Sequence, residues 1–426
     1  MQSDKNQDMA ENKGPILVVG GGISGITTAL EAAETGYEVI LIEKRPSLGG
    51  RVAGFHQYFP KLCPPTCGVE INYQRLRRNR RIQVHTNTQV GAISGQAGNF
   101  TVKLVKSPSY VNNKCVMCDK CTPVCPVEVP SDHDYGMRNT KAIHMPHRMA
   151  YPPRFVVERA HCPSGCDQCV SACRYSAIDL NMESREFEVN PASIVMATGW
   201  RPYDATKLER MQFGALPNVI TNVMMERLAA TDGPTAGEIN RPSDGKKVET
   251  VVFVQCAGSR DQEHLPYCSS ICCLASLKQA NYVRTANPDA RVYIFYIDIR
   301  TPGKFEAFYS RTREDKNIEF IKGKVAQAEP GQDGRVIVEA EDILHGGKVR
   351  VEVDLVVLAT GMESNLKTDG FDGEIVHLDE DGFASAHLQQ PGIFAAGVAQ
   401  GPVDVNSSIQ EATGVALKAI QTVGGE

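Results

Sequence analysis

The 426-residue sequence predicts an α/β protein that contains two dinucleotide-binding domains of the Rossmann type, with a cysteine-rich α+β domain inserted into the first. Three observations predict this fold. A glycine-rich motif near the start stands between an apolar run and a helix-period segment, a second strand–turn–helix unit begins near Val248, and eight cysteines crowd into residues 115–173. A chain of this length is also too long for one ordinary domain.

The first unit occupies residues 16–43, ILVVGGGISGITTALEAAETGYEVILIE. The apolar run 16–19 predicts a buried parallel strand, because both faces of such a strand are covered. The helical periodicity of residues 23–34 predicts a helix, and residues 38–42 predict a second strand. Strand, helix and strand in this order are typical of a dinucleotide-binding fold.

The turn between the first strand and the helix carries Gly20, Gly22 and Gly25 in the spacing G-x-G-x-x-G. In this motif the first glycine allows a tight turn, the second lets the backbone approach a pyrophosphate, and the third lets helix and strand pack closely. Glu43 ends the second strand, where a carboxylate accepts hydrogen bonds from ribose hydroxyls. We interpret the motif as a dinucleotide site because all its structural neighbours are in place.

Further segments favour FAD over NAD, because they resemble FAD-binding families with two dinucleotide-binding domains. These are the Gly49-Gly50-Arg51 turn, two strand-ending Ala-Thr-Gly motifs at 197–199 and 359–361, and Gly392–Gly397 before a helix at 407–423. The candidate FAD-binding residues are Gly20, Gly22, Gly25, Glu43, Gly49, Gly50, Arg51, Thr198, Gly199, Gly361 and Gly397.

One position departs from that pattern. In those families the last segment ends in Gly-Asp, whereas here Val398 replaces the aspartate and Asp404 is the candidate substitute.

The second unit, from Val248, departs further from a nucleotide site. Its turn reads Cys256-Ala-Gly258-Ser-Arg260 instead of G-x-G-x-x-G/A, so we expect a degraded NAD(P)H site.

Strand-like segments at 82–106 and from 187 onward indicate a β-meander into which the cysteine-rich segment is inserted. The predicted division is 1–106 (FAD domain, first part), 107–180 (insert), 181–247 (FAD domain continuation and crossing loop), 248–362 (second Rossmann-like domain) and 363–426 (FAD domain, C-terminal part).

The eight clustered cysteines fall into two sets. The sets are Cys115-x2-Cys118-x2-Cys121-x3-Cys125, followed by Pro126, and Cys162-x3-Cys166-x2-Cys169-x3-Cys173. The first matches the bacterial ferredoxin run, and the second is a one-residue variant of it, so we predict a ferredoxin-like insert with two [4Fe–4S] clusters. Because the fourth cysteine of such a run ligates the other cluster, Cys173 is expected with the first set and Cys125 with the second. Structural zinc is the alternative, and it would suit separate pairs better.

The remaining cysteines are candidate redox groups: Cys63, Cys67, Cys256, Cys268, Cys272 and Cys273. The first two stand in FPKLCPPTCGVEIN and are either a redox pair or cluster ligands near the flavin, or small buried residues in a proline-rich loop. The other four form either a further cluster or a redox-active thiol, or simply pack at the start of a helix. No residue is singled out as catalytic.

Composition excludes several other classes. The formal net charge of −5 gives no indication of nucleic-acid binding. The polar N-terminus lacks the apolar core of a signal peptide, and no apolar run approaches the ~20 residues of a membrane span. Fourteen cysteines without a secretory signal therefore indicate redox or metal chemistry in a reducing cytoplasm.

Four stretches resemble the family of heterodisulfide reductase A subunits, and the resemblance covers nearly the whole chain. They are residues 20–51, the segment FPKLCPPTCGVEIN, the segment VQCAGSRDQEHLPYCSSICCLASLKQA and the segment IFAAGVAQGP. Within the family, the short length and the CPPTCGVEIN stretch are most similar to the branch in the quinone-interacting membrane-bound oxidoreductase of sulfate reducers. Full-length family members carry extra ferredoxin-like segments at their ends, whereas this sequence stops at Glu426, soon after the last helix.

The resemblance implies a cytoplasmic FAD and iron–sulfur subunit that is attached to the membrane through partner subunits. Those partners would be a second flavoprotein with iron–sulfur clusters and a haem-bearing membrane subunit. The complex would link the quinone pool to adenylylsulfate reductase in dissimilatory sulfate reduction. The alternatives are a subunit of a bifurcating heterodisulfide reductase, an autonomous NAD(P)H-dependent reductase, and a scaffold that has lost its flavin.

Overall fold

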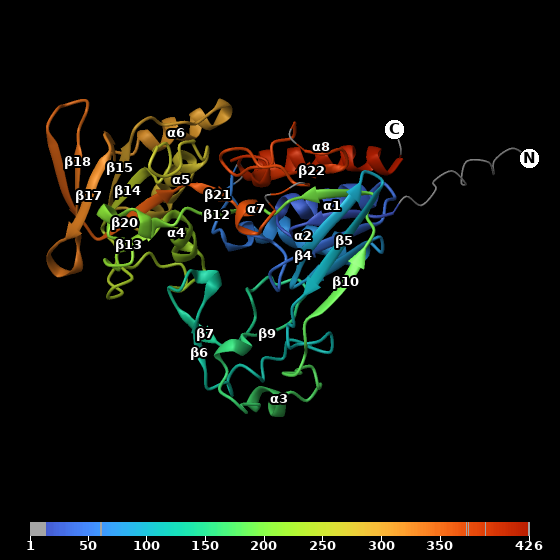
Figure 1. Ribbon diagram of the computed structural model, residues 1–426. Coiled ribbons are helices and arrows are strands. Elements are labelled where there is room, and N and C mark those ends of the chain that lie inside the picture. Colours follow the sequence, from blue (N-terminus) through green and yellow to red (C-terminus); the bar gives the residue numbers. More distant parts are fainter. Residues whose placement is uncertain (1–13, 60–61, 372, 374, 388, 425–426) are drawn as a thin grey trace, which may run out of the picture.

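The computed structural model describes residues 14–59, 62–371, 373, 375–387 and 389–424 (Figure 1). Two α/β domains lie side by side, and a smaller lobe hangs below them (Figure 1). Residues 1–13 of the predicted first domain lie outside the described part of the chain.

The first domain is built on a five-stranded parallel sheet in the order β22-β11-β1-β2-β3. Its strands are β1 (Ile16–Val19), β2 (Val39–Glu43), β3 (Ile82–Thr86), β11 (Ser193–Met196) and β22 (Ile393–Ala395). Three helices accompany it: α1 (Ile23–Glu34), α2 (Thr66–Arg78) and the C-terminal α8 (Val405–Gly424).

Alternate residues of β1 enter two different cores, because successive side chains of a strand point to opposite faces. Ile16 and Val18 pack with the helices, whereas Leu17 and Val19 pack with a meander on the other face. The meander consists of β4 (Thr88–Gln96), β5 (Asn99–Lys106) and β10 (Arg185–Val189). Both faces of the sheet are therefore covered, which explains the unbroken apolar run of its strands.

The second domain repeats this architecture with a parallel sheet in the order β13-β20-β14-β15-β16. Its strands are β13 (Val219–Thr221), β14 (Thr250–Ala257), β15 (Arg291–Tyr296), β16 (Ile318–Lys322) and β20 (Leu355–Thr360), and its helices are α4 (Asn222–Ala229), α5 (Cys272–Ala286) and α6 (Glu306–Arg313). An antiparallel sheet of β17 (Val325–Pro330), β18 (Val336–Glu341) and β19 (Lys348–Val353) projects from it (Figure 1). Two short strands, β12 (Trp200–Pro202) and β21 (Met362–Ser364), pair where the chain crosses between the domains, and the short helix α7 (Asn365–Thr368) follows.

The small lobe leaves the first domain after β5 and returns at β10, two strands that pair through Lys106 and Arg185. It contains little regular structure: β6 (Glu128–Pro130), β7 (Asn139–Lys141), β8 (Ile143–His144), β9 (Val156–Val157) and α3 (Gln168–Ala172). Its core combines apolar side chains such as Val129, Ile143 and Phe155 with Cys121, Cys125 and Cys169. We refer to residues 107–180 as the cysteine lobe.

A buried ion pair joins the three parts. Arg227, on α4 of the second domain, donates from Nε to Asp134 of the cysteine lobe at 2.8 Å, and both side chains are almost fully buried. The same guanidinium donates to the Gly54 carbonyl of the first domain and to Asp232. One side chain thus fixes the second domain against the other two parts.

The helices foreseen from periodicity are confirmed, with small shifts at their ends. The helix predicted at 23–34 has those bounds, and that predicted at 407–423 runs from Val405 to Gly424. None of the helices in the described residues combines the length and the apolar character that a bilayer crossing requires.

Replacing Asp134 by Asn should destabilise the fold by about 3 kcal/mol, because it leaves the Arg227 charge buried with a weakened partner. The midpoint of urea unfolding measures the loss. Glu188→Gln is the control, since its pair with Lys103 is exposed and its loss should cost less than about 1 kcal/mol. Equal shifts in the two variants would contradict the assignment.

Candidate functional site

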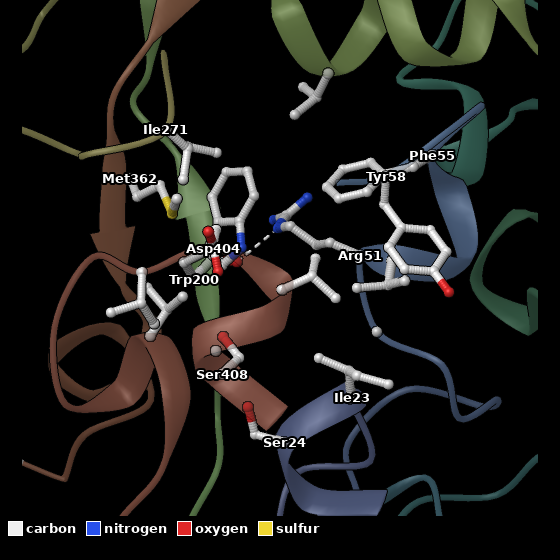
Figure 2. A pocket seen from close by; sticks show the side chains of 18 of the residues that line it. Ile23, Ser24, Arg51, Phe55, Tyr58, Trp200, Ile271, Met362, Asp404 and Ser408 are labelled. Carbon is white, nitrogen blue, oxygen red and sulfur yellow. Dashed lines mark hydrogen bonds between the residues drawn. The ribbon is translucent and has the colours of Figure 1, made fainter. Parts of the chain in front are cut away.

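A cavity of about 1370 Å³ opens at the carboxyl ends of the first sheet and reaches the second domain (Figure 2). Gly22, Glu43 and Thr198 line it from the first domain, and Asn222 and Lys278 from the second. Ligands of α/β proteins bind at this edge of the sheet. Its lining runs from Gly22 and Glu43 of the first domain to Asn222 and Lys278 of the second, so it suits an extended molecule.

The three motif glycines differ in what constrains them. A Cβ on Gly20, where φ is +114°, would lie 2.3 Å from the Ala197 carbonyl oxygen, and one on Gly25 would lie 1.8 Å from the Gly20 carbonyl oxygen. The protein itself therefore requires these two glycines. At Gly22 the nearest atom is the Gly50 Cα at 3.9 Å, so the space beside it is open to a ligand.

Glu43 is held by backbone donors at the cavity edge. Its Oε2 accepts from the Gly21 N–H at 2.7 Å, and its Oε1 accepts from the Arg45 N–H at 2.8 Å. Burial raises the pKa of this carboxyl, while the two N–H groups and nearby cations oppose the rise. The carboxylate is thus fixed in place, with lone pairs left for further donors.

Arg51 and Trp200 form one wall of the cavity (Figure 2). The guanidinium lies over the indole ring, 5.0 Å from its centroid, and donates from Nε to the Trp200 carbonyl. Its Nη1 donates to the hydroxyl of Tyr135, which belongs to the cysteine lobe, at 3.0 Å. Burial lowers the pKa of Arg51, and Tyr135 opposes this effect. The wall of the cavity is therefore tied to the lobe.

The other sequence-predicted residues divide into two groups. Gly50, Thr198 and Gly199 line the cavity, as does Asp404, whose Oδ1 accepts from the Ser407 N–H at the start of α8. The Thr198 hydroxyl is buried without a hydrogen-bond partner in the described residues. Gly49, Gly361 and Gly397 do not line the cavity, but a Cβ on them would approach Tyr73, Ser259 and Ser24 to 2.6, 2.2 and 2.2 Å.

No sequence motif predicted the wall of the cavity that lies opposite the glycine-rich turn. Lys278 on α5 donates to the Gln57 carbonyl at 2.6 Å and lies 2.9 Å from Glu226 on α4, with both side chains buried. Phe55 and Tyr58 complete this end. These residues come from separate helices and loops and carry no local pattern, so only the tertiary structure brings them to the cavity.

In the cysteine lobe the last cysteine of each run lies in the cavity that the first three cysteines of the other run line. Cys115, Cys118 and Cys121 line one cavity of about 340 Å³ together with Cys173. Cys162, Cys166 and Cys169 line another, of about 310 Å³, together with Cys125. Burial raises the pKa of Cys121 to about 11 and raises that of Cys169, so these thiols hold their protons unless a cation displaces them.

A second set of cysteines, Cys256, Cys268, Cys272 and Cys273, lies beside the large cavity. Burial raises the pKa of Cys272 far above its usual value, and charge on the other three adds to the effect. The Cys272 thiol donates to the Thr360 carbonyl, and the Cys273 thiol donates to the Asp298 carbonyl. They surround the start of α5, whose neighbouring Ile271 lines the cavity.

Cys63 and Cys67 lie at the opposite edge. Cys63 forms a β-bridge with Tyr58, which lines the cavity, and Cys67 is exposed in the first turn of α2.

The corresponding turn of the second domain has another geometry. β14 ends at Ala257 and α5 begins only at Cys272, so no helix N-terminus follows the strand directly, as a pyrophosphate site requires. The Tyr203 ring covers Gly258, where a Cβ would lie 2.4 Å from the ring, and its hydroxyl meets His264 Nδ1 at 2.8 Å. The turn is filled by the protein's own side chains.

Two buried histidines, His133 and His147, lie at the interface between the first domain and the cysteine lobe; we call them the seam histidines. The rings of His133 and His147 stack with centroids 5.3 Å apart and border a second cavity of about 1390 Å³. Burial lowers the pKa of His133 to about 3 and that of His147 to about 4.

Comparison with known proteins confirms the family resemblance. Residues 18–76 match the family model of an NAD(P)-binding Rossmann-like domain. The chain is 39% identical over 95% of its length to the second of two CoB–CoM heterodisulfide reductase iron–sulfur A subunits of Methanopyrus kandleri, and 38% identical over 97% to the corresponding iron–sulfur protein of Methanocaldococcus jannaschii. It is 37% identical over 96% to the A subunit of a ferredoxin/F420H2-dependent CoB–CoM heterodisulfide reductase of Methanosarcina acetivorans. It spans 63%, 65% and 53% of these relatives.

Solved structures confirm the fold. The thioredoxin reductase of Lactococcus lactis superposes with a TM-score of 0.54 at 14% identity, covering 97% of this chain and 100% of that one. The flavoprotein disulfide reductase RclA of Escherichia coli gives 0.51 at 12% identity, covering 97% and 72%. The predicted α/β fold with two thioredoxin-reductase-like domains is therefore correct.

The seam histidines should make the fold labile to acid. Between about pH 6.5, the ordinary histidine pKa, and pH 4 the unfolded chain binds protons that the folded chain excludes, so stability falls as the pH falls. Thermal unfolding followed across this range should show a weaker pH dependence for a His133→Gln, His147→Gln double variant. His387→Gln, on an exposed side chain, should leave the dependence unchanged. Superimposable wild-type and double-variant profiles would refute this account.

Proposed function

We propose, from the homology of this chain to heterodisulfide reductase A subunits, that it is an FAD and iron–sulfur electron-transfer subunit of a larger redox complex. The observation that carries this proposal is the grouping of eight cysteines into two four-thiol cavities in a lobe tied to a nucleotide cavity. Four thiolates around one small cavity suit a [4Fe–4S] cluster. The chain is accordingly an oxidoreductase component.

FAD fits the large cavity on the chemistry of its walls. Gly22 leaves room for the pyrophosphate, Glu43 offers acceptors for ribose hydroxyls, and the unpartnered Thr198 hydroxyl faces the same space. Arg51 and Trp200 provide a charged and an aromatic surface where a flavin ring would lie. Bound FAD would supply exchange between two-electron and one-electron transfer. The residues of the chain would hold and orient the cofactor and exclude water from it.

The two lobe clusters would be held by crossed ligand sets, as bacterial two-cluster ferredoxins hold theirs. Cys173 would complete the set of Cys115, Cys118 and Cys121, and Cys125 the set of Cys162, Cys166 and Cys169. The contact between Arg51 and Tyr135 supports a short route between this lobe and the flavin. A third cluster is proposed on Cys256, Cys268, Cys272 and Cys273 from their place around the start of α5. Iron would have to displace the thiol protons of Cys272 and Cys273, which burial holds by raising their pKa.

An autonomous NAD(P)H-dependent reductase is the weaker alternative. The turn that would hold the pyrophosphate is filled by Tyr203, and α5 begins too late to face a phosphate. We therefore expect electrons to enter and leave through partner proteins.

Two roles within the family can be assigned to such a subunit. The relatives include proteins named as hydrogen-dependent heterodisulfide and ferredoxin reductase subunits, and these names support a bifurcating heterodisulfide reductase role more directly. The CPPTCGVEIN stretch supports instead the quinone-linked branch, in which a second flavoprotein and a haem-bearing membrane subunit would connect the quinone pool to adenylylsulfate reductase. In that role the chain would be cytoplasmic and peripheral to the membrane.

Anaerobic co-purification from mildly solubilised native membranes distinguishes the two roles. Recovery with adenylylsulfate reductase and a haem-bearing membrane subunit would establish the quinone-linked role. Recovery with a hydrogenase and heterodisulfide reductase catalytic subunits would establish the bifurcating one.

Gly22→Ala should abolish FAD retention and leave the fold intact, because its Cβ would enter the space of the pyrophosphate without meeting protein atoms. Flavin absorbance per chain after desalting measures retention, and circular dichroism checks the fold. Gly414→Ala, a helical site with open space around it, should keep its FAD. A Gly22→Ala protein with a full complement of flavin would place the nucleotide elsewhere.

Iron content tests the number of clusters. Two lobe clusters predict about eight irons per chain and a third predicts about twelve. Cys272→Ser should then lower the count by about four, and Cys118→Ser should do so independently. Zinc in place of iron would overturn the assignment.

A further inference from the structure

Arg154 connects the first α/β domain to the cysteine lobe. Its Nη2 donates to the Thr86 hydroxyl at 3.1 Å, and its Nη1 donates to the Asn113 side-chain oxygen at 3.1 Å. Thr86 is buried at the end of β3, and Asn113 stands two residues before Cys115. One guanidinium therefore touches both bodies at once.

Each end of this connection leads to a proposed cofactor site. Thr86 is the register partner of Glu43 in the parallel pairing of β2 and β3, and Glu43 lines the nucleotide cavity. Asn113 leads into Cys115, which lines the first cysteine cavity. The guanidinium thus links the strand beside Glu43 with the segment that precedes Cys115.

Both hydrogen-bond acceptors of the Arg154 guanidinium, Thr86 and Asn113, are neutral, so they do not cancel its positive charge. Its Nε–H is buried without a hydrogen-bond partner in the described residues. The hydrogen bond from its Nη1 to Asn113, two residues before Cys115, holds the guanidinium beside the segment that leads into the first cysteine set. Arginine nevertheless stays protonated in proteins, so the positive charge persists beside the cysteine set.

The second cysteine set has its own arginine. Arg159 stands three residues before Cys162, the first member of that set, whose thiol donates to the Glu158 carbonyl at 3.8 Å. The two sets therefore face different guanidinium groups, and these can be altered separately.

We propose that Arg154 is a positioning residue that raises the reduction potential of the cluster held by Cys115, Cys118, Cys121 and Cys173. The inference rests on the proposed function, because it takes a [4Fe–4S] cluster to occupy that cavity. A cluster gains one negative charge when it accepts one electron, and a fixed positive charge in a partly buried site stabilises that reduced form.

Potentiometric titration of the purified holoprotein, followed by electron paramagnetic resonance, tests this role in wild type, R154M, R154K and R159M. R154M should lower the potential of one cluster, and R154K, which keeps the charge, should recover most of the loss. R159M should shift a different cluster, so that the double variant shifts both. Iron per chain is measured in every sample.

The outcomes separate the inference from the proposed function. Wild-type protein without iron would overturn both. Full iron in R154M with unchanged potentials, a potential in R154K as low as in R154M, or a shift of the same cluster by R159M would overturn the inference alone. Should R154M lose its iron, R154Q replaces it and must show a lower potential than R154K.

Discussion

The arrangement of this molecule depends on one ion pair that is buried where three bodies meet. Arg227 of the second domain enters the junction almost fully buried and binds Asp134 of the cysteine lobe and the Gly54 carbonyl of the first domain. Two charges without water hold their geometry only when their remaining donors and acceptors are also satisfied. Asp134 meets this condition through Ser131 and Arg138, and Arg227 through Asp232.

This junction sets the distance between the proposed redox centres. The nucleotide cavity lies between the two α/β domains, and Arg51 on its wall donates to Tyr135, immediately after Asp134 in the chain. The same turn of the lobe therefore serves both the ion pair and the cavity wall. The two α/β domains also meet directly, since Lys278 of the second donates to the Gln57 carbonyl of the first. The lobe adds a further attachment through Asp134, which suits the proposed passage of electrons between fixed positions.

Short sequence patterns correctly predicted the elements of the glycine-rich unit at the start of the chain. The strand at 16–19, the helix at 23–34 and the acidic residue at the end of the second strand are encoded by apolar runs, periodicity and glycine spacing within one short unit. Spacing also predicts that Cys125 and Cys173 each ligate the cluster of the other set. The structure lines the two cavities with these cysteines, and the ligation itself stays a prediction. Lys278 and Arg154 could not be foreseen, because their partners lie far away in the sequence and carry no motif.

The most direct test of the central claim is the anomalous diffraction of anaerobically grown crystals, recorded on both sides of the iron and of the zinc absorption edges. The account predicts iron peaks in two separate cavities of the cysteine lobe, one surrounded by Cys115, Cys118, Cys121 and Cys173 and the other by Cys125, Cys162, Cys166 and Cys169. Peaks that appear only at the zinc edge, or a lobe in which each run of four cysteines encloses its own metal, would contradict it.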